Sequence, residues 1–161
     1  MTEQALLGAG CFWGVEHILK KTEGVISTTV GYSGGEVIGP TYQMVSSGKT
    51  GHAEVVLVEF DPKILSYEAL LDVFFRLHDP TTLNQQHNDI GTQYRSVIFT
   101  YSHEQFETAK LMIKKWNDSN VFKNPVVTQV EPAQEFYPAE NDHQDYLIKN
   151  PDGYMCHILR K

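Results

Sequence analysis

The residue with the greatest chemical potential is Cys11, which lies in Gly10-Cys11-Phe12-Trp13-Gly14, where an apolar segment gives way to a helical pattern. A thiol at a helix N-terminus meets unpaired N–H groups and the positive end of the helix dipole, and both favour the thiolate. The glycines permit a sharp turn, and Phe12 and Trp13 put apolar surface beside the sulfur. The alternative is an inert buried cysteine in a packed turn, because cysteine is among the most buried residue types.

Glu54 is a candidate acid at the head of the apolar run 55–58. Because strand side chains alternate between faces, it shares a face with Val56 and Val58. The pattern alone favours a solvated strand end, since glutamate is rarely buried. If the carboxyl is desolvated instead, its pKa rises and it becomes a possible general acid.

Three polar residues in predicted loops are further candidates. Asp89 and Tyr94 flank a glycine turn ahead of a strand, and Tyr42 lies in another loop. A phenol can donate a hydrogen bond to a substrate oxygen, although without the cysteine each residue would be an ordinary loop residue. Tyr32, beside 33–35, is expected to shape a turn.

A second thiol, Cys156, lies close to the polar C-terminus. A resolving cysteine must reach an oxidised sulfur and form a disulfide with it, and a flexible tail allows that movement. An incidental thiol is the open alternative. The seven histidines show no local metal-ligand spacing, and there is no phosphate-binding or dinucleotide motif, so we expect no metal and no cofactor.

Length and composition indicate a single catalytic domain over 1–161, since 161 residues with 41% hydrophobic content can bury an adequate core. The net charge of −7 without long basic runs argues against nucleic-acid and anionic-membrane partners. No apolar stretch approaches the ~20 residues of a membrane helix, and the N-terminus lacks a signal-peptide pattern. Two cysteines do not make a secreted disulfide framework. We therefore expect a cytoplasmic monomer.

Hydrophobic periodicity and turn residues predict the elements of this domain. The predicted strands are 5–7, 25–32, 53–60, 94–101 and 126–130, and the predicted helices are 12–21, 66–77, 102–116 and 143–148. Ser102 and Gln105 match a capping box. The first six elements run β-α-β-β-α-β, which is typical of an α+β, ferredoxin-like two-layer sandwich. Long loops at 33–52 and 78–93 and an irregular C-terminal tail from about 131 are expected to wrap around the Cys11 turn.

Several motifs in the same order make the chain resemble the A-type peptide methionine sulfoxide reductases, which reduce the S epimer of the sulfoxide. The motifs that carry this resemblance are 10–14, 31–35, 40–42, 47–55, 89–96 and 136–140. Ser46, His87 and Asp142 depart from the family pattern, which usually has cysteine, glycine and tyrosine there.

The resemblance implies a role for each candidate residue. By resemblance, Cys11 is the nucleophile, and Phe12 and Trp13 hold the S-methyl group of the substrate. Glu54 is the acid, and Tyr42 and Tyr94 bind the sulfoxide oxygen. Asp89 is a supporting polar residue with Arg95 as its possible partner, and Cys156 recycles the enzyme.

The implied reaction reduces free or protein-bound methionine sulfoxide to methionine and leaves a sulfenic acid on Cys11. Cys156 then forms a disulfide that a thioredoxin-like partner reduces, with no metal or organic cofactor. The alternative class is a thiol redox sensor or peptide-binding module without turnover. A sensor needs neither a methyl-sized aromatic slot nor a buried acid, whereas a reductase needs both.

Overall fold

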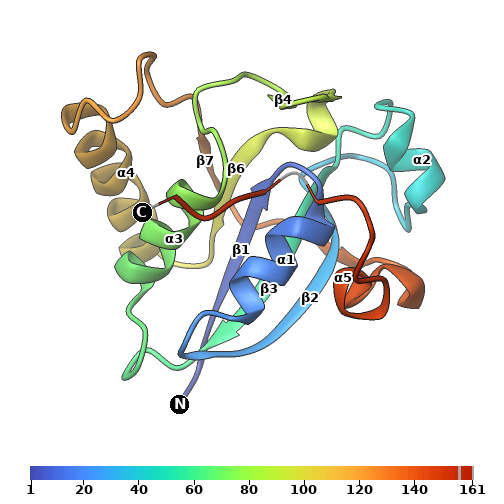
Figure 1. Ribbon diagram of the computed structural model, residues 1–161, viewed down its shortest axis with the longest axis horizontal. Helices are drawn as coiled ribbons and strands as arrows, with labels where there is room; N and C mark the ends of the chain where they lie inside the picture. The colour runs from blue at the N-terminus through green and yellow to red at the C-terminus, as the bar shows by residue number, and fades with distance from the viewer. Residues whose placement is uncertain (156, 161) are drawn as a thin grey trace.

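A curled six-stranded sheet organises the chain (Figure 1). The computed structural model describes residues 1–155 and 157–160, so Cys156 lies outside the described residues. The elements are β1 (Glu3–Ala9), α1 (Phe12–Lys20), β2 (Val25–Ser33), α2 (Tyr42–Ser46), β3 (Ala53–Phe60), α3 (Tyr67–Leu77), β4 (Gln85–Gln86), β5 (Asp89–Ile90), η1 (Thr92–Tyr94), β6 (Ser96–Thr100), α4 (His103–Asp118), β7 (Gln129–Pro132), β8 (Phe136–Pro138), η2 (Asn141–His143) and α5 (Tyr146–Lys149).

The strand order in the sheet is β7-β6-β1-β3-β2-β8. Neighbouring strands are antiparallel except for β6 and β7, which are parallel and are joined through α4. The central strand β1 pairs Leu7 with Val56 on one side and with Ile98 on the other. Its last five residues are buried because strands flank it and packed layers cover both its faces.

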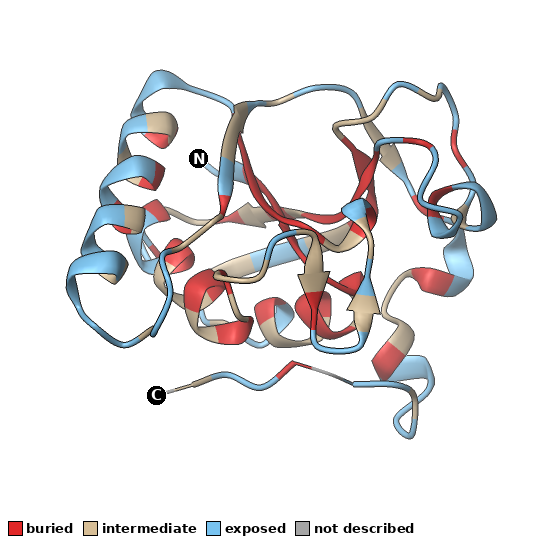
Figure 2. Cartoon of the chain, turned by 90° about the horizontal axis from the view of Figure 1, so that it is seen from above, coloured by how far each residue is buried: buried red, intermediate tan, exposed pale blue. Residues whose placement is uncertain are grey.

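Helices α1, α3 and α4 cover one face of the sheet and form the main core with it (Figures 1 and 2). Phe12 and Leu19 of α1 and Phe74 of α3 are fully buried there. The opposite face holds a smaller apolar cluster around Phe99, covered in part by Phe136. This two-sided burial explains why the central strands are apolar on both faces.

The main predicted helices and strands are confirmed. Ser102 Oγ accepts from the Gln105 N–H at 3.2 Å, as the capping-box match predicts, and Ser66 caps α3 in the same way by accepting from the Ala69 N–H at 3.0 Å. The strand predicted at 94–101 begins two residues later, because Thr92–Tyr94 form a 3₁₀ turn.

Three expectations were wrong. The loop predicted at 33–52 contains α2, which Thr41 caps by accepting from the Met44 N–H at 3.2 Å. The tail is not irregular throughout, because β8 pairs with β2 and completes the sheet. Tyr32 does not shape a turn: it is a fully buried strand residue whose ring lies 5.7 Å from that of Phe12. Each of these features depends on contacts with distant segments.

His87 adopts a left-handed conformation, with φ 51°, in the turn between β4 and β5. This is the position at which the family pattern usually has glycine, a residue without a Cβ to restrict positive φ. A non-glycine residue in that region costs about 1–2 kcal/mol. The departure therefore adds local strain to this turn.

The C-terminal segment crosses the start of α1 and ends against α3 (Figure 1). His157 donates from Nε2 to the Ala9 carbonyl oxygen at 2.7 Å, and the Arg160 N–H donates to the Arg76 carbonyl oxygen at 2.9 Å. Gly14 makes this approach possible, because a Cβ there would lie 2.4 Å from His157 Nδ1. No helix among the described residues is both long and apolar enough to cross a membrane.

Replacing Gly14 with alanine should loosen the C-terminal segment without unfolding the domain. A helical alanine is about 1 kcal/mol more favourable than glycine, whereas the new methyl group displaces His157. We expect an equal or higher melting temperature, together with faster hydrogen exchange at the Arg160 amide. Retained protection of that amide in Gly14→Ala, or a large fall in melting temperature, would contradict this account.

Candidate active site

Cys11 lies between β1 and α1, as the sequence predicts, and is the N-cap residue of the helix. It is 7% exposed. Gly10 precedes it with φ 95°, a conformation that L side chains rarely adopt, and a Cβ there would lie 2.8 Å from Gln86 Cγ. The glycine therefore allows both the turn and the close approach of the segment that contains Gln86.

Glu54 is buried, with 1% of its surface exposed, so a solvated strand end is the wrong interpretation. It belongs to β3 and faces the same core as Val56, where the start of α1 covers it. Its Oε1 accepts a hydrogen bond from the Phe12 N–H at 3.2 Å. Its Oε2 is buried and has no hydrogen-bond partner in the described part of the chain.

Burial raises the pKa of Glu54 to about 8, and the negative charge of Asp89 acts in the same direction. The Phe12 N–H opposes this shift, because it stabilises the carboxylate, but it is outweighed by desolvation. The carboxyl group is therefore mainly protonated at neutral pH. With Oε1 already accepting, a proton on Oε2 gives the group an O–H donor.

Aromatic rings from distant segments stack beside Cys11. Trp13 lies between two of them: its ring centroid is 3.9 Å from that of Tyr146 and 6.2 Å from that of Tyr42. The indole Nε1–H of Trp13 donates to His143 Nδ1 at 3.0 Å, and the imidazole in turn lies 4.2 Å from the Tyr42 ring. Phe12 stacks on Tyr42 at 6.3 Å. These contacts fix the orientation of an apolar wall next to the thiol.

Tyr42 is held at the start of α2 by Glu140. The Tyr42 N–H donates to Glu140 Oε2 at 3.0 Å, and the Tyr32 hydroxyl donates to Oε1 of the same carboxylate at 3.0 Å. Desolvation of Glu140 favours its neutral form, but these hydrogen bonds and the nearby His143 outweigh it and lower its pKa. A carboxylate at this position thus joins α2 to β2.

Tyr42 and Tyr94 are both partly buried phenols close to Glu54. Burial raises the pKa of Tyr42 to about 12, and the negative charges of Glu54, Cys11 and Asp89 contribute to the same shift. Burial is also the largest cause that raises the pKa of Tyr94. The negative charges of Glu54, Tyr42, Asp89 and Cys11 add to this shift. Both hydroxyls therefore remain protonated at neutral pH and can donate hydrogen bonds.

Asp89 lies in the β4–β5 hairpin and accepts a hydrogen bond from the Tyr154 hydroxyl at 3.3 Å. Its expected pairing with Arg95 is replaced by another contact, since Arg95 Nη1 donates to the Thr92 carbonyl oxygen at 2.9 Å. The structure thus brings Cys11, Glu54 and their aromatic and polar neighbours together. Cys156 lies outside the described residues.

Sequence reasoning missed the part of the site that the tail supplies. Residues Glu140, His143 and Tyr146 orient Tyr42 and Trp13, but none was a candidate. The 136–140 motif and the expectation that the tail wraps around the Cys11 turn were signs that the tail mattered, but neither singled out these residues. Their partners lie about a hundred residues earlier in the chain, for example 130 positions between Trp13 and His143.

A thiol at a helix N-terminus, a buried acid that is protonated at neutral pH and two partly buried phenols are groups that cysteine-dependent enzymes use. A sequence model of the family "Peptide methionine sulfoxide reductase" matches residues 3–161. A protein of that name from Methanothermobacter thermautotrophicus is 53% identical over 158 residues, which cover 98% of this chain and 93% of the relative. The chain belongs to the peptide methionine sulfoxide reductase family.

Solved structures agree with this assignment. The crystal structure of reduced Mxr1 from Saccharomyces cerevisiae is similar with a TM-score of 0.93 and 41% identity, covering 99% of this chain and 93% of that one. The structure of Mxr1 in complex with Trx2 is similar with a TM-score of 0.66 and 29% identity, covering 99% of this chain and 91% of that one.

The raised pKa of Glu54 predicts a specific pH dependence of stability. Because the native carboxyl holds its proton up to about pH 8, whereas the ordinary pKa is 4.5, its contribution is complete below pH 4.5. This stabilisation, on the order of several kcal/mol, is lost as the pH rises from 4.5 to about 8. Glutamine does not titrate, so the free energy of unfolding of Glu54→Gln should lack the decrease with pH that Glu54 causes in the parent protein.

Urea unfolding of both proteins at a series of pH values between 4 and 9 measures the effect. The stability difference between Glu54→Gln and the parent protein should shift in favour of the variant as pH rises. Parallel curves over this range would show that the native carboxyl titrates near its ordinary value.

Proposed function

We propose that this chain reduces the S epimer of methionine sulfoxide, free or within proteins, to methionine, with Cys11 as the nucleophile and Glu54 as the proton donor. The observation that carries the proposal is the buried Oε2 of Glu54, which has no partner among the described residues and belongs to a carboxyl with a pKa of about 8. An acid that is protonated near neutral pH suits a reaction that creates a basic oxygen.

In the first step, the Cys11 thiolate attacks the sulfoxide sulfur while the sulfoxide oxygen takes up negative charge. Glu54 transfers its proton to that oxygen, and the hydroxyls of Tyr42 and Tyr94 donate hydrogen bonds to it. The S–S bond formed in this attack then breaks as the protonated oxygen moves from the substrate sulfur to the Cys11 sulfur, which releases methionine and leaves a sulfenic acid on Cys11. The substrate is reduced by two electrons, and the cysteine is oxidised by two.

The substrate methyl group is proposed to bind against Phe12 and Trp13, with Asp89 as a supporting polar residue. The stacking of Tyr146 on Trp13 and the hydrogen bond from Trp13 to His143 support this role, because they keep the indole ring in one orientation. A buried acid and an apolar wall are features that a redox sensor does not need. The reductase is therefore favoured over the sensor alternative.

Regeneration is proposed to use Cys156 and an external dithiol. The Cys156 thiol condenses with the Cys11 sulfenic acid, which forms a disulfide and releases water. A thioredoxin-like partner then reduces the disulfide by thiol–disulfide exchange and becomes oxidised itself. The similarity to Mxr1, which has been solved in complex with Trx2, supports such a partner.

We also propose that 1–161 is a single catalytic domain with a ferredoxin-like βαββαβ core. The antiparallel order β6-β1-β3-β2 supports this description, since it places the fourth strand of the motif beside the first and the third beside the second. Strands β7 and β8 then extend the two edges. A cytoplasmic location remains a proposal that rests on cysteine usage.

Replacing Cys11 with serine should abolish turnover of methyl p-tolyl sulfoxide with dithiothreitol, because a serine hydroxyl remains protonated near neutral pH. Chiral chromatography of the remaining substrate should show that the parent protein consumes only the S enantiomer. Activity of Cys11→Ser within about tenfold of the parent would refute the assignment, since loss of a nucleophile normally costs orders of magnitude.

Replacing Cys156 with serine should spare the first turnover and stop thioredoxin-driven cycling. Cys11 still attacks the substrate, so about one methionine per protein is released and a dimedone-reactive sulfenic acid accumulates. Rapid-quench analysis of methionine gives the burst, and mass spectrometry detects the adduct. Steady-state turnover at the parental rate with thioredoxin would show that another route reduces the sulfenic acid.

A further inference from the structure

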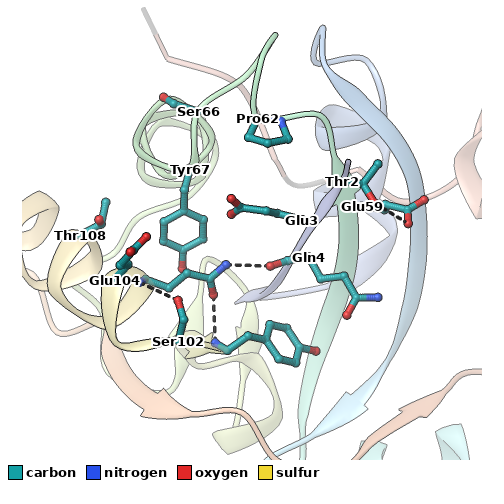
Figure 3. Close-up of a pocket in the computed structure, with 12 residues that line it drawn as sticks. Thr2, Glu3, Gln4, Glu59, Pro62, Ser66, Tyr67, Ser102, Glu104 and Thr108 are labelled. Carbon is teal, nitrogen blue, oxygen red and sulfur yellow. Dashed lines mark hydrogen bonds between the residues drawn. The ribbon is translucent and has the colours of Figure 1, made fainter.

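A cavity of about 740 Å³ lies at the opposite end of β1 from Cys11 (Figure 3). It is lined by Glu3 and Gln4 at the start of β1, by Tyr67 at the start of α3 and by residues at the start of α4. Seven strand residues at ~3.3 Å each separate the cavity from the active-site end of β1 by about 20 Å. The proposed reaction does not use this cavity.

The cavity is acidic and partly apolar. Three carboxylates, those of Glu3, Glu59 and Glu104, belong to its lining, and none of the described lining residues is lysine, arginine or histidine. Pro62 and Tyr101 add apolar surface. An uncompensated group of negative charges next to apolar surface attracts a cation that also has an apolar part.

Tyr67 provides a second, independent observation at the same cavity. The residue is only 9% exposed, its ring packs 6.3 Å from that of Phe60, and its buried hydroxyl has no hydrogen-bond partner among the described residues. Burial, and to a smaller extent the charge of Glu3, raises its pKa, so the hydroxyl is protonated and its lone pairs can accept. In Figure 3 the carboxylate of Glu3 points toward this tyrosine.

The wall next to Tyr67 is partly fixed and partly movable. Gln105 is held by three contacts: its N–H donates to Ser102 Oγ at 3.2 Å, its Oε1 accepts from the Tyr101 N–H at 3.0 Å, and its Nε2 donates to the Gln4 carbonyl oxygen at 2.8 Å. Glu104, in contrast, is exposed. Because the Tyr67 hydroxyl is buried, a ligand reaches it only when an exposed side chain of the lining, such as that of Glu104, moves aside.

We propose that this cavity binds a small aliphatic polyamine. Its ammonium groups would pair with the separated carboxylates of Glu3 and Glu104 and donate to the Tyr67 hydroxyl, while its methylene groups contact Pro62 and Tyr101. A metal ion fits less well, because no group of three potential ligands converges anywhere in the described residues. The volume lies within the 300–1,000 Å³ usual for small-molecule sites.

Calorimetric titration of the intact protein with spermidine at low ionic strength tests the proposal. We expect saturable binding of one spermidine per chain, weakened about tenfold or more by Glu3→Gln, because a charge-assisted hydrogen bond is lost. The matched control is Glu68→Gln, which removes the same charge from exposed surface of α3 outside the cavity. Equal weakening by both variants, or no saturable binding, would overturn the proposal.

Tyr67→Phe provides a second test that does not change charge. Removing an unpartnered buried hydroxyl should leave the melting temperature of the free protein equal or higher, while the rise in melting temperature with spermidine should fall several-fold. An undiminished rise would exclude contact with the hydroxyl. A blocked lysine tripeptide should bind more weakly than spermidine. Tighter binding of the peptide would show that the cavity binds a lysine side chain of a polypeptide and not a polyamine. Sulfoxide turnover is measured separately, so failure here leaves the proposed function intact.

Discussion

The hydrogen bond from the Phe12 N–H to Glu54 Oε1 is the contact on which the arrangement of the site depends. It uses one of the unpaired N–H groups at the start of α1 and ties the helix to β3. Cys11, the residue directly before Phe12, is thereby placed next to the acid. The packing of α1 on β3 also buries the carboxyl, and this burial raises its pKa even though the Phe12 N–H itself lowers it.

The polar groups at this site are neutral donors rather than charged ones. Glu54 holds its proton because burial outweighs the stabilising N–H, whereas the phenols of Tyr42 and Tyr94 are protonated at neutral pH in any case and burial raises their pKa further. Donors that are already oriented toward a developing negative charge need little reorganisation during the reaction. In the proposed mechanism the buried environment therefore serves catalysis directly, although it costs stability as pH rises.

The C-terminal tail completes this arrangement by linking distant parts of the chain. Gln144 forms paired hydrogen bonds with the backbone of Val30, both at 2.8 Å, and Glu16 of α1 accepts from the Asp145 N–H at 2.8 Å. On either side of these two adjacent anchors, η2 and α5 bring His143 and Tyr146 against Trp13. The aromatic wall therefore has its orientation set by the tail rather than by the helix that carries it.

The sequence by itself determined the local features: the turn at Cys11, the β-α-β-β-α-β order and the helices that begin after Ser66 and Ser102. These depend on periodicity and caps within a few residues of each other. Its motifs also determined the family. Only the tertiary structure decided that Glu54 is buried, that Tyr32 lies in the core beside Phe12 and that His143 supports Trp13. Desolvation and ring contacts depend on which distant segment covers a residue, and local periodicity carries no information about that segment.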